Sequence, residues 1–415
     1  MIRIGAIVIL AVLCIMLMTP VVSAQWHLYY MGYTYTPGLP HDVVARGDYA
    51  YVADWTAGLS IISLANPYFP HCISGYNTAG NANTLELVGN YAYVADWNRG
   101  ISIIDISNPL NPQQVSTWDS PGQASDVYVK DSYAYIADYN SGMSIVNISN
   151  PASPQFARRI IVGNFATGIW GDGNYVYLAN STAGLKTYDI TTPDTAILVD
   201  TYNSDGDGAN VTGASGYLYL CDGLHGVKIM SLADPAHPAF VSTVETPGFV
   251  NDAAASDTFL FAADDSAGVV AISIARPSSP YIIDTFNSPG TATGVFAIAP
   301  KVYLGDNSSF QLLILDDHDA VDQDIITPSI FDLKDIYPNP FNAQAIIEFS
   351  LAKNLSISID AYDIMGSQID HIADGVYETG TYKIIWDASD FPSGIYFIRL
   401  SSGLTFKTVK AALLK

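Results

Sequence analysis

Acidic side chains that recur at a fixed interval are the residues best suited to chemistry. An Asp stands at positions 54, 96 and 138, and the 42-residue interval continues through Asn180, Asp222, Asp264 and Asp306. An acid copied into every repeat is typical of a structural cap, because a carboxylate oxygen can hold the backbone of a turn. We therefore interpret the Asp54 set as turn caps.

A second acidic set recurs in three repeats only and comprises Asp42, Asp126 and Asp252. Turn geometry does not demand these residues, since the other repeats lack them. Carboxylate oxygens suit hard cations, which makes Ca²⁺ the one cofactor that the sequence suggests. A metal site formed by Asp42, Asp126 and Asp252 is thus a hypothesis, and a structural role for them stays open.

Three aromatic residues, Trp55, Trp97 and Tyr139, follow the acids of three consecutive repeats. Flat apolar rings with a polar edge can stack on a sugar or a peptide, so we predict that they bind a ligand. The alternative is packing between neighbouring loops, because aromatic residues are often simply buried.

Motifs of known catalysis do not occur in the sequence. It contains no HExxH, GxSxG, P-loop or CxxC pattern, and its histidines lack metal-ligand spacing. His41 beside Asp42 is the one pairing of interest, and we interpret His41 as a surface-loop histidine, because a single neighbour without metal-ligand spacing is a weak signal. We predict no catalytic residue.

The elements that position these residues form a 42-residue repeat. Each complete copy holds four strand-like runs; in the second they lie near Leu85–Val88, Tyr91–Ala95, Ile101–Ile106 and Gln113–Trp118. Four strands in about 42 residues is the size of a β-propeller blade, and a solenoid is the alternative.

The ends of the array favour a closed ring over a solenoid. The seventh copy lacks its fourth strand, while an orphan strand, Leu28–Tyr35, precedes the first copy. Pairing the two would close a seven-bladed β-propeller and remove a raw edge. In such a ring the innermost strands would bring Asp42, Asp126 and Asp252 to the channel, on the face that carries Trp55, Trp97 and Tyr139.

The third strands read GLSIISLANP, GISIIDISNP and GMSIVNISNP. This resembles the LVIVD-repeat family, and the resemblance covers roughly Trp26 to Asp316, weakening after the third copy. It implies an extracellular bacterial propeller and says little about activity.

The chain divides into four parts. Residues 1–24 have an Arg, an apolar run and a Val-Ser-Ala end, which predicts a cleaved signal peptide, with an uncleaved anchor as the alternative. Residues 25–316 are the propeller, 317–332 an acidic linker and 333–415 a second β-domain. We expect no transmembrane segment after signal cleavage.

The last part is similar to the type A sorting domain of the type IX secretion system. The resemblance implies a small Ig-like β-sandwich that the export machinery recognises, and so a secreted protein at the outer-membrane surface or in the medium. An ordinary adhesive sandwich is the alternative. The matching residues are Tyr337, Pro338, Asn339, Pro340, Phe341, Asn342, Trp386, Asp387, Gly394, Tyr396 and Lys415.

The net charge of -23 excludes some partners, since an acidic surface repels nucleic acid and anionic membranes. We predict an all-β, monomeric, non-catalytic interaction module that binds an extracellular protein, peptide or glycan. A lyase or hydrolase with an acidic channel and a purely structural surface protein are the alternatives. An enzyme should show a deep pocket with carboxylates of raised pKa, and a binding module an exposed aromatic patch.

Overall fold

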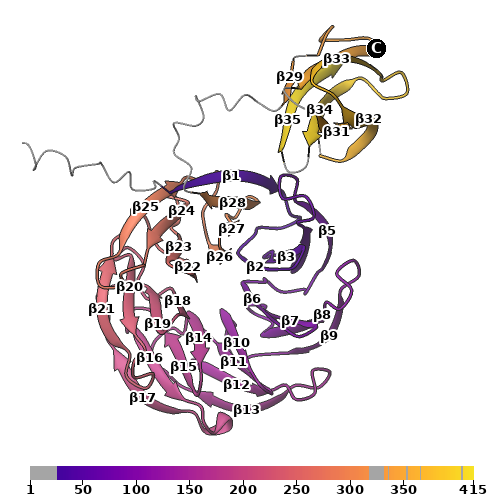
Figure 1. Cartoon of the computed structure of the whole chain (residues 1–415). Coiled ribbons are helices and arrows are strands. Elements are labelled where there is room, and N and C mark those ends of the chain that lie inside the picture. The colour runs from indigo at the N-terminus through magenta and orange to yellow at the C-terminus, as the bar shows by residue number, and fades with distance from the viewer. Residues whose placement is uncertain (1–25, 317–330, 335, 352–353, 365, 403–404) are drawn as a thin grey trace, which may run out of the picture. The chain divides into compact units, whose positions relative to one another are not determined.

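The computed structural model describes residues 26–316, 331–334, 336–351, 354–364, 366–402 and 405–415. The predicted signal peptide and most of the predicted linker lie outside these residues. The chain forms two compact units, residues 1–318 and 319–415. Within its described residues, the first unit consists of seven four-stranded antiparallel sheets arranged in a ring (Figure 1).

Each sheet runs from an inner strand at the channel to an outer strand at the circumference. The inner strands are β2 (Asp42–Arg46), β6 (Thr84–Val88), β10 (Asp126–Lys130), β14 (Gly168–Asp172), β18 (Asn210–Ala214), β22 (Asp252–Ser256) and β26 (Gly294–Ile298). The second strands are β3 (Tyr49–Ala53), β7 (Tyr91–Ala95), β11 (Tyr133–Ala137), β15 (Tyr175–Ala179), β19 (Tyr217–Cys221), β23 (Phe259–Ala263) and β27 (Lys301–Gly305).

The third strands are β4 (Leu59–Ser63), β8 (Ile101–Asp105), β12 (Met143–Asn147), β16 (Leu185–Asp189), β20 (Val227–Ser231), β24 (Val269–Ser273) and β28 (Phe310–Asp316). The outer strands are β5 (His71–Tyr76), β9 (Gln113–Trp118), β13 (Gln155–Ile160), β17 (Ile197–Tyr202), β21 (Ala239–Val244), β25 (Tyr281–Phe286) and β1 (His27–Thr34). A short 3-10 helix, Pro193–Thr195, precedes β17.

The N-terminal strand closes the ring, as the sequence predicts. The seventh sheet has the order β1-β28-β27-β26, and β1 pairs with β28 from His27 opposite Asp316 to Thr34 opposite Phe310. The Leu28 backbone N–H also donates to Asp284 of the preceding blade at 2.7 Å. Both ends of the array are therefore fixed in one blade, which excludes the solenoid.

Neighbouring blades are held together by packing and by polar contacts at the circumference. The aromatic column that begins at Tyr51 is almost fully buried, because it fills the space between adjacent sheets. Outer strands add stacked pairs across blades, such as Trp118 with Phe156, whose rings lie 6.3 Å apart. Ser116 Oγ donates to the carbonyl of Pro151 in the next blade at 2.5 Å.

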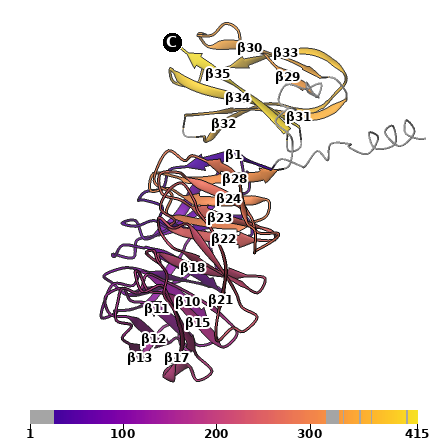
Figure 2. The same ribbon diagram turned by 90° about the vertical axis from the view of Figure 1, so that its left-hand side faces the viewer.

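The second unit is a two-layer sandwich (Figure 2). Its layers pack around one apolar core that includes Phe341, Trp386 and Tyr396. One sheet contains β29 (Phe331–Leu333), β30 (Gln344–Leu351) and β33 (Gly380–Asp387); the other contains β31 (Leu355–Tyr362), β32 (Gln368–Tyr377), β34 (Gly394–Ser402) and β35 (Thr405–Leu413).

The boundary of this unit differs slightly from the prediction. Strand β29 begins at Phe331, two residues before the predicted domain start at 333. Phe331 is 1% exposed and pairs with Leu351, so apolar burial draws it into the sandwich. A strand of three residues is too short to show a periodic pattern in the sequence.

Candidate functional site at the channel mouth

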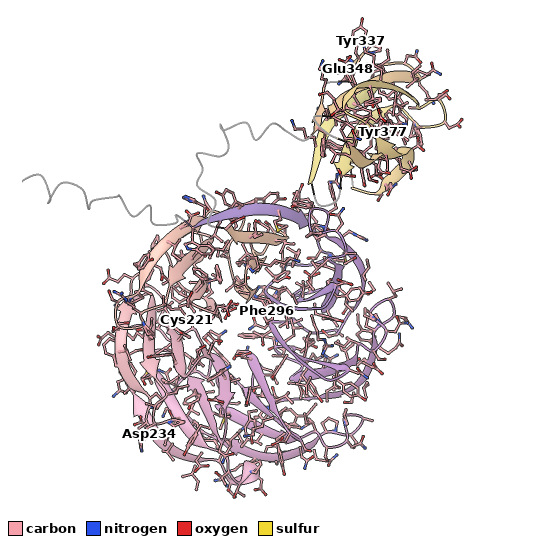
Figure 3. The ribbon with its side chains drawn as sticks, in the orientation of Figure 1. Cys221, Asp234, Phe296, Tyr337, Glu348 and Tyr377 are labelled. Carbon is pink, nitrogen blue, oxygen red and sulfur yellow. The ribbon has the colours of Figure 1, made fainter. Side chains whose placement is uncertain are left out.

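A cavity of about 590 Å³ opens at the centre of the ring. The inner strands line it, and Figure 3 shows one of its lining residues, Phe296, at the inner edge of the ring. Asp42, Asp126 and Asp252 open strands β2, β10 and β22, and all three line this cavity. The structure thus brings the predicted acidic set to one place, although the residues come from different blades.

Each of these carboxylates accepts a hydrogen bond from the next blade. The backbone N–H of Leu85 donates to Asp42 at 3.0 Å, that of Ile169 to Asp126 at 2.8 Å, and that of Val295 to Asp252 at 2.9 Å. The inner strand is the edge of its sheet, so its outward N–H groups need acceptors. The acids therefore join adjacent blades, a structural role that the sequence pattern left open.

Glu86 is a fourth channel acid that sequence reasoning missed. It lies two residues into β6 and accepts a hydrogen bond from the Val129 backbone N–H of the next blade. Its counterparts in four other blades are Val44, Tyr128, Trp170 and Phe296. A lone carboxylate in a largely apolar column was the signal that could have revealed it.

The channel environment raises the pKa of all four acids. Burial raises the pKa of Asp126 to about 6, of Asp252 to about 7 and of Glu86 to about 8. The pKa of Asp42 also lies well above its usual value, because of burial and then because of the charge of Asp252. The backbone N–H groups that donate to these carboxylates stabilise the charged form and so offset part of the effect of burial.

The geometry gives the metal hypothesis little support. Within the described residues, no group of three or more His, Cys, Asp or Glu side chains could hold a metal ion. The carboxylates of Asp42, Asp126 and Asp252 point to separate backbone donors around the ring, which leaves the Ca²⁺ hypothesis without a ligand set.

The Asp54 set caps turns, as interpreted from the sequence. Asp54 is fully buried and accepts hydrogen bonds from Thr36 Oγ1 at 2.5 Å, the Gly38 N–H at 3.0 Å and Ser60 Oγ at 2.7 Å. The second blade repeats this arrangement, with Asp96 between Thr78 Oγ1 at 2.6 Å and Ser102 Oγ at 3.1 Å.

Two blades vary the same network in a compensated way. In the fourth blade Val162 replaces the first hydroxyl, Lys186 the second, and the acid becomes Asn180, which donates to the Val162 carbonyl at 3.4 Å. In the fifth blade Lys228, 7% exposed, lies 3.1 Å from the carboxylate of Asp222. Because a buried carboxylate needs donors or a cation, the partners change together.

Trp55, Trp97 and Tyr139 form part of a continuous series of ring contacts, which we call the aromatic arc. Its ring centroids are 4.3 Å apart for His41 and Trp55, 6.2 Å for Trp55 and Trp97, 5.6 Å for Trp97 and Tyr139, and 4.4 Å for Tyr139 and Phe165. The three predicted residues are half-buried. Their rings therefore pack against neighbouring loops and still keep part of their surface accessible to a ligand.

The arc reaches the cavity at two points. His41 and Tyr139 line the cavity, whereas Trp55 and Trp97 lie between them in the series. The three predicted aromatics have positive φ angles of 43°, 45° and 28°, an unfavourable conformation for bulky residues. Sequence reasoning missed Phe165 and the cavity-lining Phe249, which share one loop position two repeats apart.

The sorting-motif residues divide between the core and the surface of the second unit. Asn339 bridges to β35, donating to the Lys410 carbonyl at 2.8 Å and accepting from the Ala412 N–H at 2.8 Å. Asp387 accepts from Gln344 at 2.9 Å, and the Lys415 ammonium donates to the Ser389 carbonyl. Tyr337 is 73% exposed. The motif thus fixes the first loop of the unit against its last strand.

Comparisons with known proteins agree with this architecture. The LVIVD repeat model matches residues 37–78, 79–120, 121–161 and 163–204, and the model of the secretion system C-terminal sorting domain matches residues 335–415. A search of curated proteins finds no significant match. Within the described residues, no helix has the length and apolarity needed to cross a membrane.

Solved structures share the propeller fold at low identity. The β-propeller domain of Cps50 (Swd1) from Myceliophteria thermophila aligns with a TM-score of 0.58 and 10% identity, covering 70% of this chain and 100% of that one. U3-55K aligns with a TM-score of 0.58 and 9% identity, covering 69% of this chain and 98% of that one. The computationally designed Ika8 protein aligns with a TM-score of 0.54 and 8% identity, covering 69% of this chain and 99% of that one.

These matches support the fold, and the two family models identify both parts of the chain. The C-terminal domain implies an interaction with the type IX export machinery and marks proteins sent to the cell surface or the extracellular space. The chain is an LVIVD-repeat β-propeller protein that carries a secretion system C-terminal sorting domain.

Proposed function

We propose that the propeller is a non-catalytic module that binds an extracellular protein, peptide or glycan at the channel mouth. The observation that carries this proposal is the aromatic arc beside a cavity of about 590 Å³. That volume lies within the range of small-molecule sites, and rings with partly exposed faces are suited to recognition.

The arc also has a rigid support. Trp55 and Trp97 each sit in a hairpin turn whose backbone bonds to the following loop, with the Ala82 N–H donating to the Trp55 carbonyl at 2.9 Å and the Ala124 N–H to the Trp97 carbonyl at 3.0 Å. Turns whose backbone is held in this way lose little backbone freedom when a ligand binds, which supports a binding role for the residues that they carry.

The test is a glycan and peptide array probed with the purified protein and with the variant Trp55→Ala/Trp97→Ala. Trp118→Ala is the matched control, because it removes a stacked indole at the circumference. We expect the double variant to lose array binding while Trp118→Ala keeps it. Unchanged binding by the double variant would show that the arc is not the site.

An enzyme that uses the acidic cavity is the second candidate, and the raised pKa values of Asp126 and Asp252 favour it. A carboxyl group with a pKa near 7 can act as a general acid or base. However, each of these carboxylates already accepts a backbone hydrogen bond from the next blade. Turnover of an array ligand that Asp126→Asn abolishes, with binding retained, would establish the enzyme instead.

A further inference from the structure

We propose that the cavity at the channel mouth receives an organic cation: an ammonium or guanidinium group carried on an alkyl chain. This inference rests on the proposed binding function and narrows it to one chemical class. It depends on the carboxyl groups that line the cavity, on the neutral residues found at the same position in other blades, and on the aromatic rings that line the cavity farther along the inner strands.

The lining is rich in carboxyl groups that no cationic side chain balances. Five carboxylates line it, and the lining contains no Lys or Arg. Burial lowers the pKa of His41, which favours its neutral form. The carboxylates are Asp42, Glu86, Asp126, Asp207 and Asp252.

Joining the blades does not require these charges. At the position of Asp42, Asp126 and Asp252, the other blades have Thr84, Gly168, Asn210 and Gly294. Gly168 and Gly294 have no side chain that could accept a hydrogen bond from the next blade. Thr84 Oγ1 donates to the Ser125 carbonyl of the next blade at 3.3 Å, and Asn210 Nδ2 donates to Asp252 of the next blade at 2.8 Å. The ring therefore tolerates neutral residues at this position. The carboxylates therefore exceed what the fold needs.

Aromatic rings line the cavity two residues farther along the inner strands. Tyr128, Trp170 and Phe296 lie here, beside Glu86 in the same layer. Gly171 and Gly213 leave room for two of these rings, because a Cβ at either would meet the ring of Tyr128 or Trp170 at 2.2 or 2.3 Å. Ring faces attract cations and also pack against alkyl chains.

An organic cation fits this arrangement better than a neutral sugar or a metal ion. Protonation relieves part of the repulsion between these carboxyl groups, as the raised pKa of Asp252 reflects, and a bound cation would stabilise their ionised form, which a neutral ligand does not do. A metal ion needs converging ligands, and none of the described residues form such a group. A long cation can place its charge among the acids and its chain along the rings.

This chemistry could come from a free polyamine or from a basic side chain of a peptide. Isothermal titration calorimetry with spermidine, a single-lysine pentapeptide and cellopentaose distinguishes these sources from each other and from a neutral glycan. We expect one of the two cationic probes to bind. Its affinity should rise from pH 5.5 to 8, since Asp126 and Asp252 ionise in that interval.

The variant Asp126→Asn/Asp252→Asn tests the carboxylates directly, because the side-chain oxygen of Asn can still accept the hydrogen bond from the backbone N–H of the next blade. We expect it to weaken the affinity for the cationic probe about tenfold or more. Asp257→Asn is the matched control, since Asp257 is exposed and lies outside the cavity. Thermal unfolding checks that all variants remain folded.

The outcomes separate this inference from the proposed function. Cation binding that Asp257→Asn weakens as much as the double variant would reflect general surface charge and overturn the inference. Failure of both cationic probes, with an array ligand whose binding depends on Trp97, would overturn the cation class and leave the proposed function intact. No binding in either experiment would overturn both.

Discussion

The buried triad of Thr78, Asp96 and Ser102 allows a sharp test, because the fourth blade replaces the Thr–Asp pair of this triad by the neutral residues Val162 and Asn180. We consider Thr78→Val, Asp96→Asn and the double variant, which reproduces the pairing of Val162 with Asn180 in the fourth blade. In the wild type, Asp96 is fully buried and its carboxylate accepts bonds of 2.6 Å and 3.1 Å.

The magnitude follows from the charge on the acceptor. A hydrogen bond to a buried charged group contributes about 1.5–3 kcal/mol, so Thr78→Val should lower the free energy of unfolding by about 2 kcal/mol. Asp96→Asn should cost about 1–2 kcal/mol, because one amide donor then faces hydroxyl groups that also donate. Removing both partners together leaves no unpaired carboxylate. The double variant should therefore be more stable than the sum of the single effects by about 1 kcal/mol or more.

Denaturant unfolding of the four proteins, followed by tryptophan fluorescence, measures this coupling. The exposed Thr56→Val is the control for the hydroxyl-to-methyl change and should stay within about 0.5 kcal/mol of the wild type. Additive single effects would refute the reasoning, because they would mean that Thr78 does not stabilise the Asp96 carboxylate.

Three further predictions concern the channel, a buried ion pair and a turn. Burial raises the pKa of Glu86 to about 8 in the folded protein, which therefore binds this proton more tightly than the unfolded chain does. The free energy of unfolding should consequently fall as the pH rises from 4.5 to about 8. Glu86→Gln should therefore gain about 1–3 kcal/mol at pH 8, discounted for channel water, and almost nothing at pH 4, as urea titrations at both pH values would reveal. Lys228→Met should cost about 3–5 kcal/mol by leaving Asp222 buried and unpaired, and adding Asp222→Asn should restore much of the melting temperature. Gly100→Ala would place a Cβ 2.1 Å from the Trp118 carbonyl oxygen. Gly89→Ala is its control, because Gly89 also has a positive φ but has open space around the added Cβ. Calorimetry should show that Gly100→Ala lowers the free energy of unfolding by at least about 2 kcal/mol more than Gly89→Ala does.

The ring and its closure could be predicted from the sequence because they depend on periodic residues. The 42-residue interval fixes the blade, and the unpaired strand before the first repeat has to meet the incomplete seventh repeat. The convergence of Asp42, Asp126 and Asp252 followed from the same logic, since first strands lie innermost.

The chemistry of the mouth could not be predicted, because it depends on contacts between blades. Nothing in the pattern shows that a carboxylate of one blade accepts from a backbone N–H 43 residues later, as Asp126 does from Ile169. Glu86 appears in one repeat alone, and a search for recurring residues passes over it. The stacking of His41 on Trp55 likewise joins residues from different positions in the repeat.

Closure by β1 has a consequence for the order in which the propeller can fold. Its partner β28 begins 276 residues after β1 ends, so the seventh blade needs the longest loop closure in the ring. Strand β1 therefore has no strand with which to pair until the array is nearly complete. The finished blade then ends at Asp316, ahead of the sorting domain, and cutting the chain between the two would free a ring that lacks none of its strands.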